Sequence, residues 1–424
     1  MIRLYEQYSD TLARTVGYKY PGKTSIEATV QVTEGCSLAC TYCYQHDKTP
    51  LKMSLDTAKK YLDALIESYD KTHFAVILDF IGGEPFLEPK LIRDIVDYWY
   101  YKLIMEMDHI PWYRYIRFSI CSNGTEWFKP EVQELMNYIG QLTSFTISID
   151  GNKQLHDSAR IHPDGRGSYG EAIAAAKDYE NKYHVVLGSK MTISPYNIKY
   201  LYDALKHYMD DGAQMIHANC VYESGWTIGH AQQYYQYLKQ IADYKLKYYP
   251  EVYLSIFNEN WYSPQDPSEL QRWCGGNGKM IACDTQGTFY PCLRYTPSSV
   301  GHNRKEYVTI GDINTGINND KINELLSINR RTASDDKCFY CPIGKGCGNC
   351  QAYCWEINGT INSRTTYHCV MHQAQALANV YYWNKYYQLK SENKHFKNYV
   401  PEEWALQIID REELAMLYKI SGEC

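Results

Sequence analysis

The chain has 424 residues and a formal net charge of −6, with 45% hydrophobic and 22% charged residues. This length allows two or three packed domains, and the composition is ordinary for a globular protein. Because the sequence has no basic tract and no sustained run of charge, it excludes nucleic acid as the main partner. No apolar stretch approaches the roughly 18 residues of a membrane span. The N-terminus also lacks the apolar core of a signal peptide, so we expect a cytoplasmic protein with no membrane partner.

Between residues 27 and 220, short β-rich runs alternate with longer stretches of helical periodicity. The predicted strands are residues 28–34, 75–83, 115–124, 144–151, 184–194 and 214–222. The predicted helices are residues 54–69, 88–106, 130–139, 169–181, 197–210 and 230–249, and Ser54 is the expected N-cap of the first. Six strand–helix units imply parallel strands joined by right-handed crossovers, hence an α/β fold with a partial (β/α)6 barrel of the TIM type.

After about residue 250 the sequence changes to turn formers and cysteines, which favours a small metal-stapled domain. Helices are predicted at 370–389 and, after the break at Pro401, at 401–420. We therefore divide the chain into an N-terminal segment (1–25), a partial barrel (26–225), a bridging region (226–273), a cysteine-rich domain (274–372) and C-terminal helices (373–424).

Most of the fifteen cysteines fall into two groups, at residues 36–43 and 274–369. A reducing compartment disfavours a disulfide framework, and grouped cysteines in an intracellular protein are typical of metal sites. We therefore interpret both groups as metal ligands.

The first group lies in the loop after the first predicted strand, TEGCSLACTYCYQH. Cys36, Cys40 and Cys43 follow the pattern C-x3-C-x2-C, with Tyr42 before the last cysteine. Thiolates are soft ligands for zinc and iron–sulfur clusters, and a closed structural site uses four ligands. Three thiolates therefore leave one coordination position open for chemistry. A zinc knuckle completed by His46 is the alternative.

Small and polar residues follow the next three predicted strands. They are Gly82, Gly83 and Glu84 in GGEP, Ser122 and Asn123 in CSNG, and Ser148 and Asp150 in SISIDG. Because barrels carry their chemistry at the carboxyl ends of the strands, we expect all of them to meet the cysteine loop at one rim. Adjacent glycines let backbone approach a ligand closely. The serines, the asparagine and the aspartate have an alternative role as turn residues.

A three-cysteine loop of this spacing, followed by GGEP at the next strand end, resembles the radical S-adenosylmethionine enzymes. In that superfamily three cysteines bind three irons of a 4Fe–4S cluster, and S-adenosylmethionine chelates the fourth iron. The resemblance implies that Cys36, Cys40 and Cys43 bind the cluster and that the GGE motif binds the amino group of the cofactor's methionine. The other cofactor-binding residues that it implies are Tyr42, Ser122, Asn123, Ser148, Asp150 and, in LHDSAR, Arg160.

The second cysteine group resembles the SPASM domain, whose pattern is C, G-x4-C, C-x2-C-x5-C-x3-C and a last C. The sequence departs from it once, since Cys350 follows Cys347 after two residues rather than three and Cys354 is additional. The resemblance implies two auxiliary 4Fe–4S clusters. Cys338, Cys341, Cys347 and Cys369 would hold one, and Cys274, Cys283, Cys292 and either Cys350 or Cys354 would hold the other. A pair of zinc ribbons is the alternative.

Enzymes that pair this barrel with a SPASM domain mostly modify peptides or proteins. In the anaerobic sulfatase-maturating enzymes, an aspartate directly follows the cysteine of G-x4-C and serves as base. Leu293 stands at that place here, which argues against sulfatase maturation. LDFIGGEPFL, SISIDGNKQLHDSAR, CPIGKGCGNC and NVYYWNKYY are similar to peptide maturases whose targets carry CXXX repeats, over about residues 25–390.

This resemblance implies an oxidoreductase that uses a 5′-deoxyadenosyl radical to cross-link a ribosomally synthesised peptide, for example through a cysteine thioether. The auxiliary clusters would take up an electron or bind a substrate thiolate. The alternatives are sulfatase-type oxidation or quinone-cofactor biogenesis on a protein substrate, and a non-catalytic iron–sulfur electron carrier. An electron carrier, however, needs no three-ligand cluster beside a GGEP turn. No residue is assigned as the catalytic base.

The implied partners are a cysteine-containing precursor peptide and an external one-electron reductant such as flavodoxin or ferredoxin. Only about 25 residues precede the first predicted strand, too few for a leader-binding domain. We therefore expect a leader to be held elsewhere, either by the tyrosine-rich segment 222–262 or by a separate leader-binding protein.

Overall fold

The computed structural model describes residues 24–69, 72–105, 111–113, 115–185, 187, 189–270 and 274–423. Nearly all of the predicted N-terminal segment therefore lies outside the described residues. Six strand–helix units follow each other, as predicted. The strands are β1 (Thr24–Thr33), β2 (His73–Gly82), β3 (Ile116–Ser122), β4 (Thr143–Ile147), β5 (Ser189–Ile193) and β6 (Met215–Cys220). The helices are α3 (Leu55–Tyr69), α4 (Pro89–Met105), α5 (Pro130–Ile139), α7 (Tyr169–Tyr183), α8 (Leu201–Asp210) and α9 (Ile228–Tyr248).

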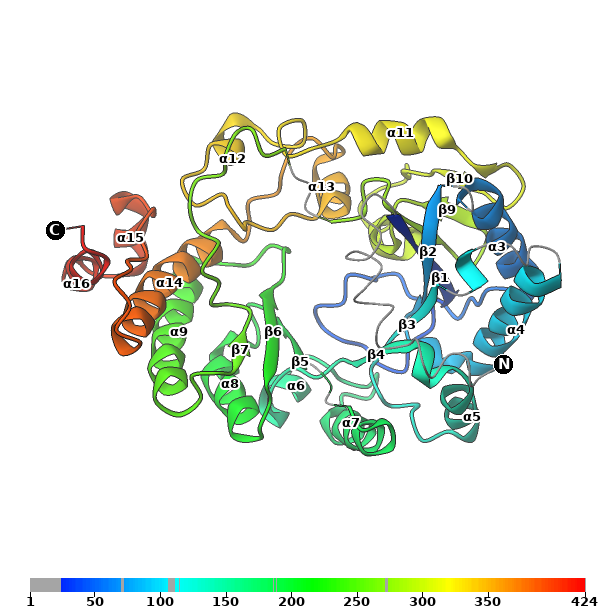
Figure 1. Cartoon of the computed structure of the whole chain (residues 1–424), viewed down its shortest axis with the longest axis horizontal. Coiled ribbons are helices and arrows are strands. Elements are labelled where there is room, and N and C mark those ends of the chain that lie inside the picture. The colour runs from blue at the N-terminus through cyan, green and yellow to red at the C-terminus, as the bar shows by residue number, and fades with distance from the viewer. Residues whose placement is uncertain are drawn as a thin grey trace.

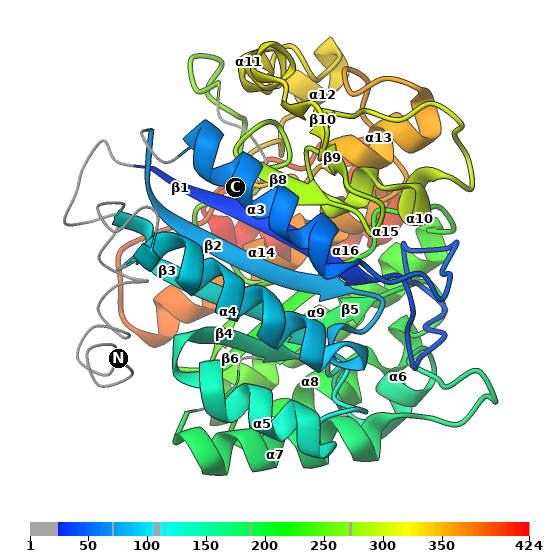
Figure 2. The ribbon, with the colours of Figure 1, turned by 90° about the vertical axis from the view of Figure 1, so that its right-hand side faces the viewer.

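The six strands form a curved wall with helices on its outer side (Figure 1). β1 to β4 pair in parallel in sequence order, and β5 pairs in parallel with β6. Figure 2 shows α3 and α4 side by side across the outer face of β1 and β2. The predicted partial barrel is confirmed, but its wall consists of two sheets, because β4 and β5 are not paired within the described ranges.

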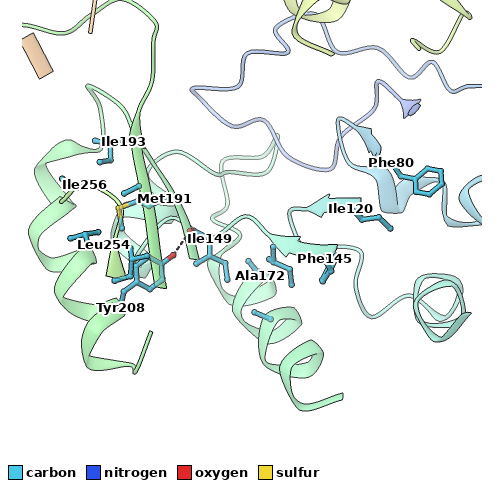
Figure 3. Packing of buried hydrophobic residues seen from close by; sticks show 14 of the residues in the cluster. Phe80, Ile120, Phe145, Ile149, Ala172, Met191, Ile193, Tyr208, Leu254 and Ile256 are labelled. Carbon is cyan, nitrogen blue, oxygen red and sulfur yellow. Dashed lines mark hydrogen bonds between the residues drawn. The ribbon is translucent and has the colours of Figure 1, made fainter. Parts of the chain in front are cut away.

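Polar contacts close the seam between β4 and β5. The backbone N–H of Thr192 in β5 donates to Asp150 Oδ1 at 2.8 Å. The hydroxyl of Tyr208 in α8 donates to the Ile149 carbonyl at 2.6 Å (Figure 3) and accepts from the Gly151 N–H at 2.9 Å. The loop after β4 is thereby held against the next strand and helix.

The period-two alternation of the strands decides which face the helices cover. In β3, Phe118 and Ile120 are buried, and Phe118 meets Tyr100 of α4 edge-on at 6.3 Å. The intervening side chains of β3 are only partly buried and face the barrel interior. The expected N-cap of α3 is confirmed, since Ser54 Oγ accepts from the Thr57 N–H at 3.0 Å.

The cysteine-rich region extends the barrel sheet. β8 (Met280–Cys283) pairs in parallel with β1, and the sheet continues through β9 (Thr288–Tyr290), β10 (Gly311–Asp312) and β11 (Gly316–Ile317). Short helices complete the region: α10 (Pro297–Val300), α11 (Asn319–Ser327), α12 (Asp336–Phe339) and α13 (Gln351–Asn358). Because Ile281 and Phe289 belong to the same buried cluster as the barrel residues, the two parts share one core.

The C-terminal part packs against the barrel through α14 (Cys369–Leu389), which lies along α9. The single helix predicted at 401–420 is wrong, because the structure has two helices there, α15 (Glu402–Ile408) and α16 (Arg411–Ser421). Asp410 causes the break, since its side chain accepts from the Glu413 N–H at 2.8 Å and caps α16. No helix within the described part of the chain has the length and apolarity needed to cross a bilayer.

Candidate active site

The carboxyl ends of the barrel strands surround a cavity of about 400 Å³, called the rim cavity here. Eleven of the predicted site residues line it: Cys36, Cys40, Tyr42, Cys43, Gly82, Gly83, Glu84, Ser122, Asn123, Ser148 and Arg160. Asp150 is fully buried and is not part of the lining. The structure therefore brings the motifs at four strand ends together at one rim.

The cysteine loop is irregular and is held by the segment after α6 (Lys153–Asp157). The N–H of Ala39 donates to the Ile161 carbonyl at 2.7 Å, and that of Thr41 donates to the Ala159 carbonyl at 2.9 Å. Burial raises the pKa of the Cys40 thiol to about 11, so metal binding has to displace its proton.

The glycines of GGEP let the loop after β2 lie directly against the cysteine loop. A Cβ atom on Gly83 would stand 2.3 Å from the Gly35 carbonyl oxygen and 2.7 Å from Cys36 Cβ. The N–H of Glu84 donates to the same Gly35 carbonyl at 2.9 Å. The sequence suggested that these glycines allow a ligand to approach the backbone closely. In the structure they also allow the cysteine loop to approach it.

Glu84 ties the end of β2 to the end of β3. Its carboxylate is 1% exposed and accepts from the Phe86 N–H at 3.1 Å, Ser122 Oγ at 2.8 Å and the Asn123 N–H at 2.8 Å. Burial raises its pKa to about 7 in spite of these donors. The Asn123 amide then donates to Ser37 Oγ in the cysteine loop at 3.0 Å. This network fixes the cysteine loop relative to two strands.

Asp150 is the centre of a second buried network. It accepts from Arg160 Nε at 2.8 Å and from the Tyr42 hydroxyl, and both donors line the rim cavity. The Asp150 N–H donates to His156 Nδ1 at 3.3 Å, and His156 Nε2 lies 3.0 Å from Ser168 Oγ. Burial lowers the pKa of His156 to about 4, so the ring is neutral and Nε2 carries the proton.

In the cysteine-rich region, Cys338, Cys341, Cys347 and Cys369 form one group. Burial raises the pKa of Cys338 to about 12 and that of Cys369 to about 11, and neighbouring thiols of the group add to both shifts. Arg364 donates from Nη2 to Cys347 Sγ at 3.2 Å, which supplies positive charge to the group. One buried and three half-buried thiols beside one arginine supply the four donors of a closed site.

A second group contains Cys274, Cys292 and Cys350. A Cβ atom on Gly276 would stand 3.3 Å from Cys292 Sγ and 3.6 Å from Cys274 Sγ. Burial raises the pKa of Cys292, and the charges of Cys350 and Cys274 raise it further. Burial raises the pKa of Cys350, and the charge of Cys354 adds to the shift. The Cys354 thiol itself donates to the side-chain oxygen of Asn349 at 3.2 Å.

Cys283 lies apart from this group, although the sequence predicted it as a ligand of the same cluster. It is fully buried in β8, and its thiol donates to the Asp284 carbonyl at 3.4 Å. Burial raises its pKa and Asp284 adds to the shift, whereas no other described cysteine contributes. The structure therefore assembles the predicted second set only in part.

Comparisons with known proteins agree with this architecture. A family model described as a 4Fe-4S single cluster domain matches residues 24–174, which contain the cysteine loop and β1 to β4. An uncharacterized protein of Methanocaldococcus jannaschii is 28% identical over 190 residues, which is 44% of this chain and 59% of that protein. The sporulation killing factor maturation protein SkfB of Bacillus subtilis is 26% identical over 193 residues, 46% of this chain and 42% of SkfB. The chain thus spans about half the length of these curated relatives.

A solved structure described as native anSMEcpe with bound AdoMet and Cp18Cys peptide shares the fold. It superimposes with a TM-score of 0.60 over 87% of this chain and 99% of that chain, at 15% identity. The chain therefore shares the fold of that structure, and residues 24–174 are similar to a 4Fe-4S single cluster domain. The 4Fe-4S match covers the cysteine loop, and the anSMEcpe structure is described with bound AdoMet.

The cysteine sets are compatible with the 4Fe–4S clusters that the sequence motifs predict. Among the described residues, no three His, Cys, Asp or Glu side chains are close enough to share a single metal ion. A four-iron cluster spaces its thiolates more widely than one ion does, so the converging cysteines suit the cluster. His46, the fourth ligand of the alternative zinc knuckle, faces His302 at 5.8 Å and does not line the rim cavity.

Sequence reasoning missed several side chains of the rim cavity. They are Tyr44, Gln45, Lys48, Lys190, Thr192, Asn219, Tyr222, Glu223 and Arg294. The position of Asn219 and Tyr222 near the carboxyl end of β6 was the available signal, because this strand ends at the same rim. His156 was missed as well, although it stands four residues before Arg160 in LHDSAR.

Proposed function

We propose that this enzyme matures a ribosomally synthesised, cysteine-containing peptide by joining a cysteine sulfur to a carbon of a neighbouring residue. One observation carries the proposal. A second cavity of about 580 Å³, called the side cavity here, lies between the barrel and the cysteine-rich region and shares Lys190, Asn219 and Tyr222 with the rim cavity. A peptide segment held there would place its next residue at the rim.

The residues of the rim have separable roles in such a reaction. The chemistry that the bound cofactors supply is one-electron cleavage of S-adenosylmethionine to a 5′-deoxyadenosyl radical, which removes hydrogen from an unactivated carbon. Cys36, Cys40 and Cys43 would hold the cluster. Arg160, oriented by Asp150, has the charge to pair with the cofactor's carboxylate. Bound substrate and cofactor would fill the rim cavity and keep water and oxidants away from reactive species.

Two further observations favour cross-linking over the alternatives. Leu293 directly follows Cys292, so the base that sulfatase maturation would need at that position is absent. SkfB is named as a maturation protein, and the anSMEcpe structure is described with a bound peptide. An external reductant such as flavodoxin or ferredoxin would supply the electron in the cytoplasm, and a separate protein or the segment 222–262 would hold a leader.

The test is anaerobic turnover with chemical reductant, S-adenosylmethionine and peptides that carry CXXX repeats. We expect release of 5′-deoxyadenosine and loss of two hydrogens per cross-link, with cysteines that no longer react with iodoacetamide. A variant with Cys36, Cys40 and Cys43 changed to alanine is the control and should release none. An aldehyde that reacts with hydrazine would instead indicate sulfatase-type oxidation. Absence of 5′-deoxyadenosine from the wild type would indicate an electron carrier.

A further inference from the structure

Among its described lining residues, the side cavity has one lysine, three histidines and three aromatic side chains. One wall comes from β5 and β6 and includes Lys190 and His217. The opposite wall comes from the bridging region, the cysteine-rich region and α14, and includes Trp261, His368 and His372. Neither aspartate nor glutamate is among the described residues that line it. Lys190 is the only Lys, Arg, Asp or Glu among the described lining residues, so the fixed charge of this lining is positive.

Lys190 and His217 stand opposite each other in the parallel register of β5 and β6. Their strand neighbours Met191 and Ala218 are buried on the helix-covered face, so the alternation directs Lys190 and His217 into the barrel interior, where both are exposed. No carboxylate of the described chain is within ion-pair distance of the Lys190 ammonium. Burial raises the pKa of Asp79 and the Lys190 charge opposes this shift; Asp79 is half-buried and accepts from a threonine hydroxyl at 3.4 Å.

His368 adds a polar group that lacks a partner. It is 8% exposed, and neither ring nitrogen makes a hydrogen bond within the described chain, although the Gly348 backbone lies beside it. Its ring meets Tyr222 edge-on at 5.0 Å. His372, by contrast, is already bonded, with Nε2 2.9 Å from the Ile343 carbonyl oxygen. A buried polar group without a partner costs free energy unless a ligand supplies one.

We propose that the side cavity binds the substrate through an Asp or Glu side chain, which Lys190 and His217 receive. This inference rests on the proposed function and names the recognition element of its substrate. Lys190, Asn219 and Tyr222 line both cavities. A substrate carboxylate bound at Lys190 would therefore position the adjoining peptide residues in the rim cavity. The peptide would therefore carry an acidic residue at a fixed spacing from the residue that reacts.

The test is a selection from a randomised library of short cysteine-containing peptides. The bait is the anaerobic holoenzyme loaded with S-adenosylmethionine. We expect the wild type to enrich Asp and Glu several-fold at one spacing from the cysteine. Lys190→Met should lose this enrichment and Lys190→Arg should retain it. Lys177→Met, on the exposed face of α7, is the charge-matched control and should behave as the wild type.

Fluorescence anisotropy then compares one enriched peptide with its Glu→Gln or Asp→Asn counterpart. We expect the wild type to bind the carboxylate peptide at least about tenfold more tightly than its amide counterpart. Lys190→Met should bind the two peptides equally. Iron content and melting temperature verify that the variant is folded. The inference is overturned if the wild type does not enrich Asp or Glu, or if Lys190→Met enriches them equally.

Mass spectrometry of the same peptides after turnover separates this inference from the proposed function. If acidic peptides bind in a Lys190-dependent manner but remain unmodified, the proposed cross-linking fails and the binding site stands. If peptides without an acidic residue are modified as fast as those with one, the carboxylate site fails and the proposed function stands.

Discussion

At the scale of single residues, the buried carboxylate of Glu84 holds two strand ends together. Both of its oxygens accept hydrogen bonds, from Phe86, Ser122 and Asn123. In Glu84→Gln the amide group would turn one N–H toward a donor that then has no acceptor. We expect a loss of about 1–3 kcal/mol in the free energy of unfolding. Release of 5′-deoxyadenosine should fall as well, because Asn123 no longer positions the cysteine loop.

Urea unfolding and turnover with S-adenosylmethionine measure both effects. Glu67→Gln, on the exposed face of α3, is the matched control and should change the free energy of unfolding by less than about 0.5 kcal/mol. If Glu84→Gln is as stable and as active as this control, Glu84 does not have the structural role assigned to it.

His156 makes the Asp150 network sensitive to acid. Burial lowers its pKa to about 4, whereas an unfolded histidine titrates near about 6.5. Between these two values the unfolded chain binds more protons, so stability falls as the pH drops from about 6.5 toward 4. The loss from this group should not exceed about 3–4 kcal/mol.

The check is the free energy of unfolding at several pH values in wild type, His156→Asn and His184→Asn. Asparagine at 156 still offers an acceptor to the Asp150 N–H but does not titrate, so its curve should be flatter than that of the wild type. His184 is exposed at the end of α7, and its variant should keep the slope of the wild type. Acid loss of the clusters affects all three proteins and cancels in the comparison. Parallel curves for wild type and His156→Asn would refute the assignment.

At the scale of elements, the loop after β2 and the cysteine loop are in contact at Gly83. Alanine there would place a Cβ atom 2.3 Å from the Gly35 carbonyl oxygen, so backbone has to move. Because Cys36 is adjacent, we expect Gly83→Ala to lose about four irons per chain and to release 5′-deoxyadenosine about 100-fold more slowly.

Gly170→Ala is the control for this substitution. Gly170 lies in α7 with nothing within 4 Å of an added Cβ atom. Alanine in a helix should stabilise the protein by about 0.5–1 kcal/mol and leave the iron content intact. Full iron content in Gly83→Ala would show that the two loops adjust to each other easily.

The sequence predicts well those elements whose signal is local. Short β-rich runs located β1 to β6, and the polar motifs at the strand ends located most of the rim. The break between α15 and α16 was missed because Asp410 also suits the polar face of one amphipathic helix. The pairing of β8 with β1 joins segments about 250 residues apart, and a strand of four residues carries no periodic signal. Arg294 and Tyr222 reach the rim through such long-range contacts.

At the scale of the whole molecule, the barrel and the cysteine-rich region jointly line the two cavities. β8 extends the barrel sheet beyond β1, and α14 packs along α9 beyond β6, so the cysteine-rich region is attached on both sides of the barrel wall. This arrangement sets the auxiliary cysteines beside the side cavity, since Gly346, Gly348 and His368 line it. If the proposed function holds, the auxiliary clusters would lie beside the cavity that binds the peptide.

The iron content of the whole chain tests which cysteines hold the auxiliary clusters. Three four-iron clusters require about 12 irons per chain in the anaerobically reconstituted protein. Cys292→Ala should lose about four of them, because Cys292 belongs to the group with Cys274 and Cys350. Cys283→Ala should keep all of them and be destabilised by about 1 kcal/mol, since it removes only a buried sulfur from the core.

Iron and sulfide analysis of the two variants, with melting temperatures, distinguishes a ligand from a core residue. Cys121→Ala, at the end of β3, is a further control outside both cysteine groups and should keep its iron. If Cys283→Ala loses as much iron as Cys292→Ala, Cys283 is a ligand and β8 has to shift when the cluster binds. If only Cys292→Ala loses iron, the second auxiliary cluster is held by Cys274, Cys292 and Cys350, with Cys354 the one remaining thiol beside them.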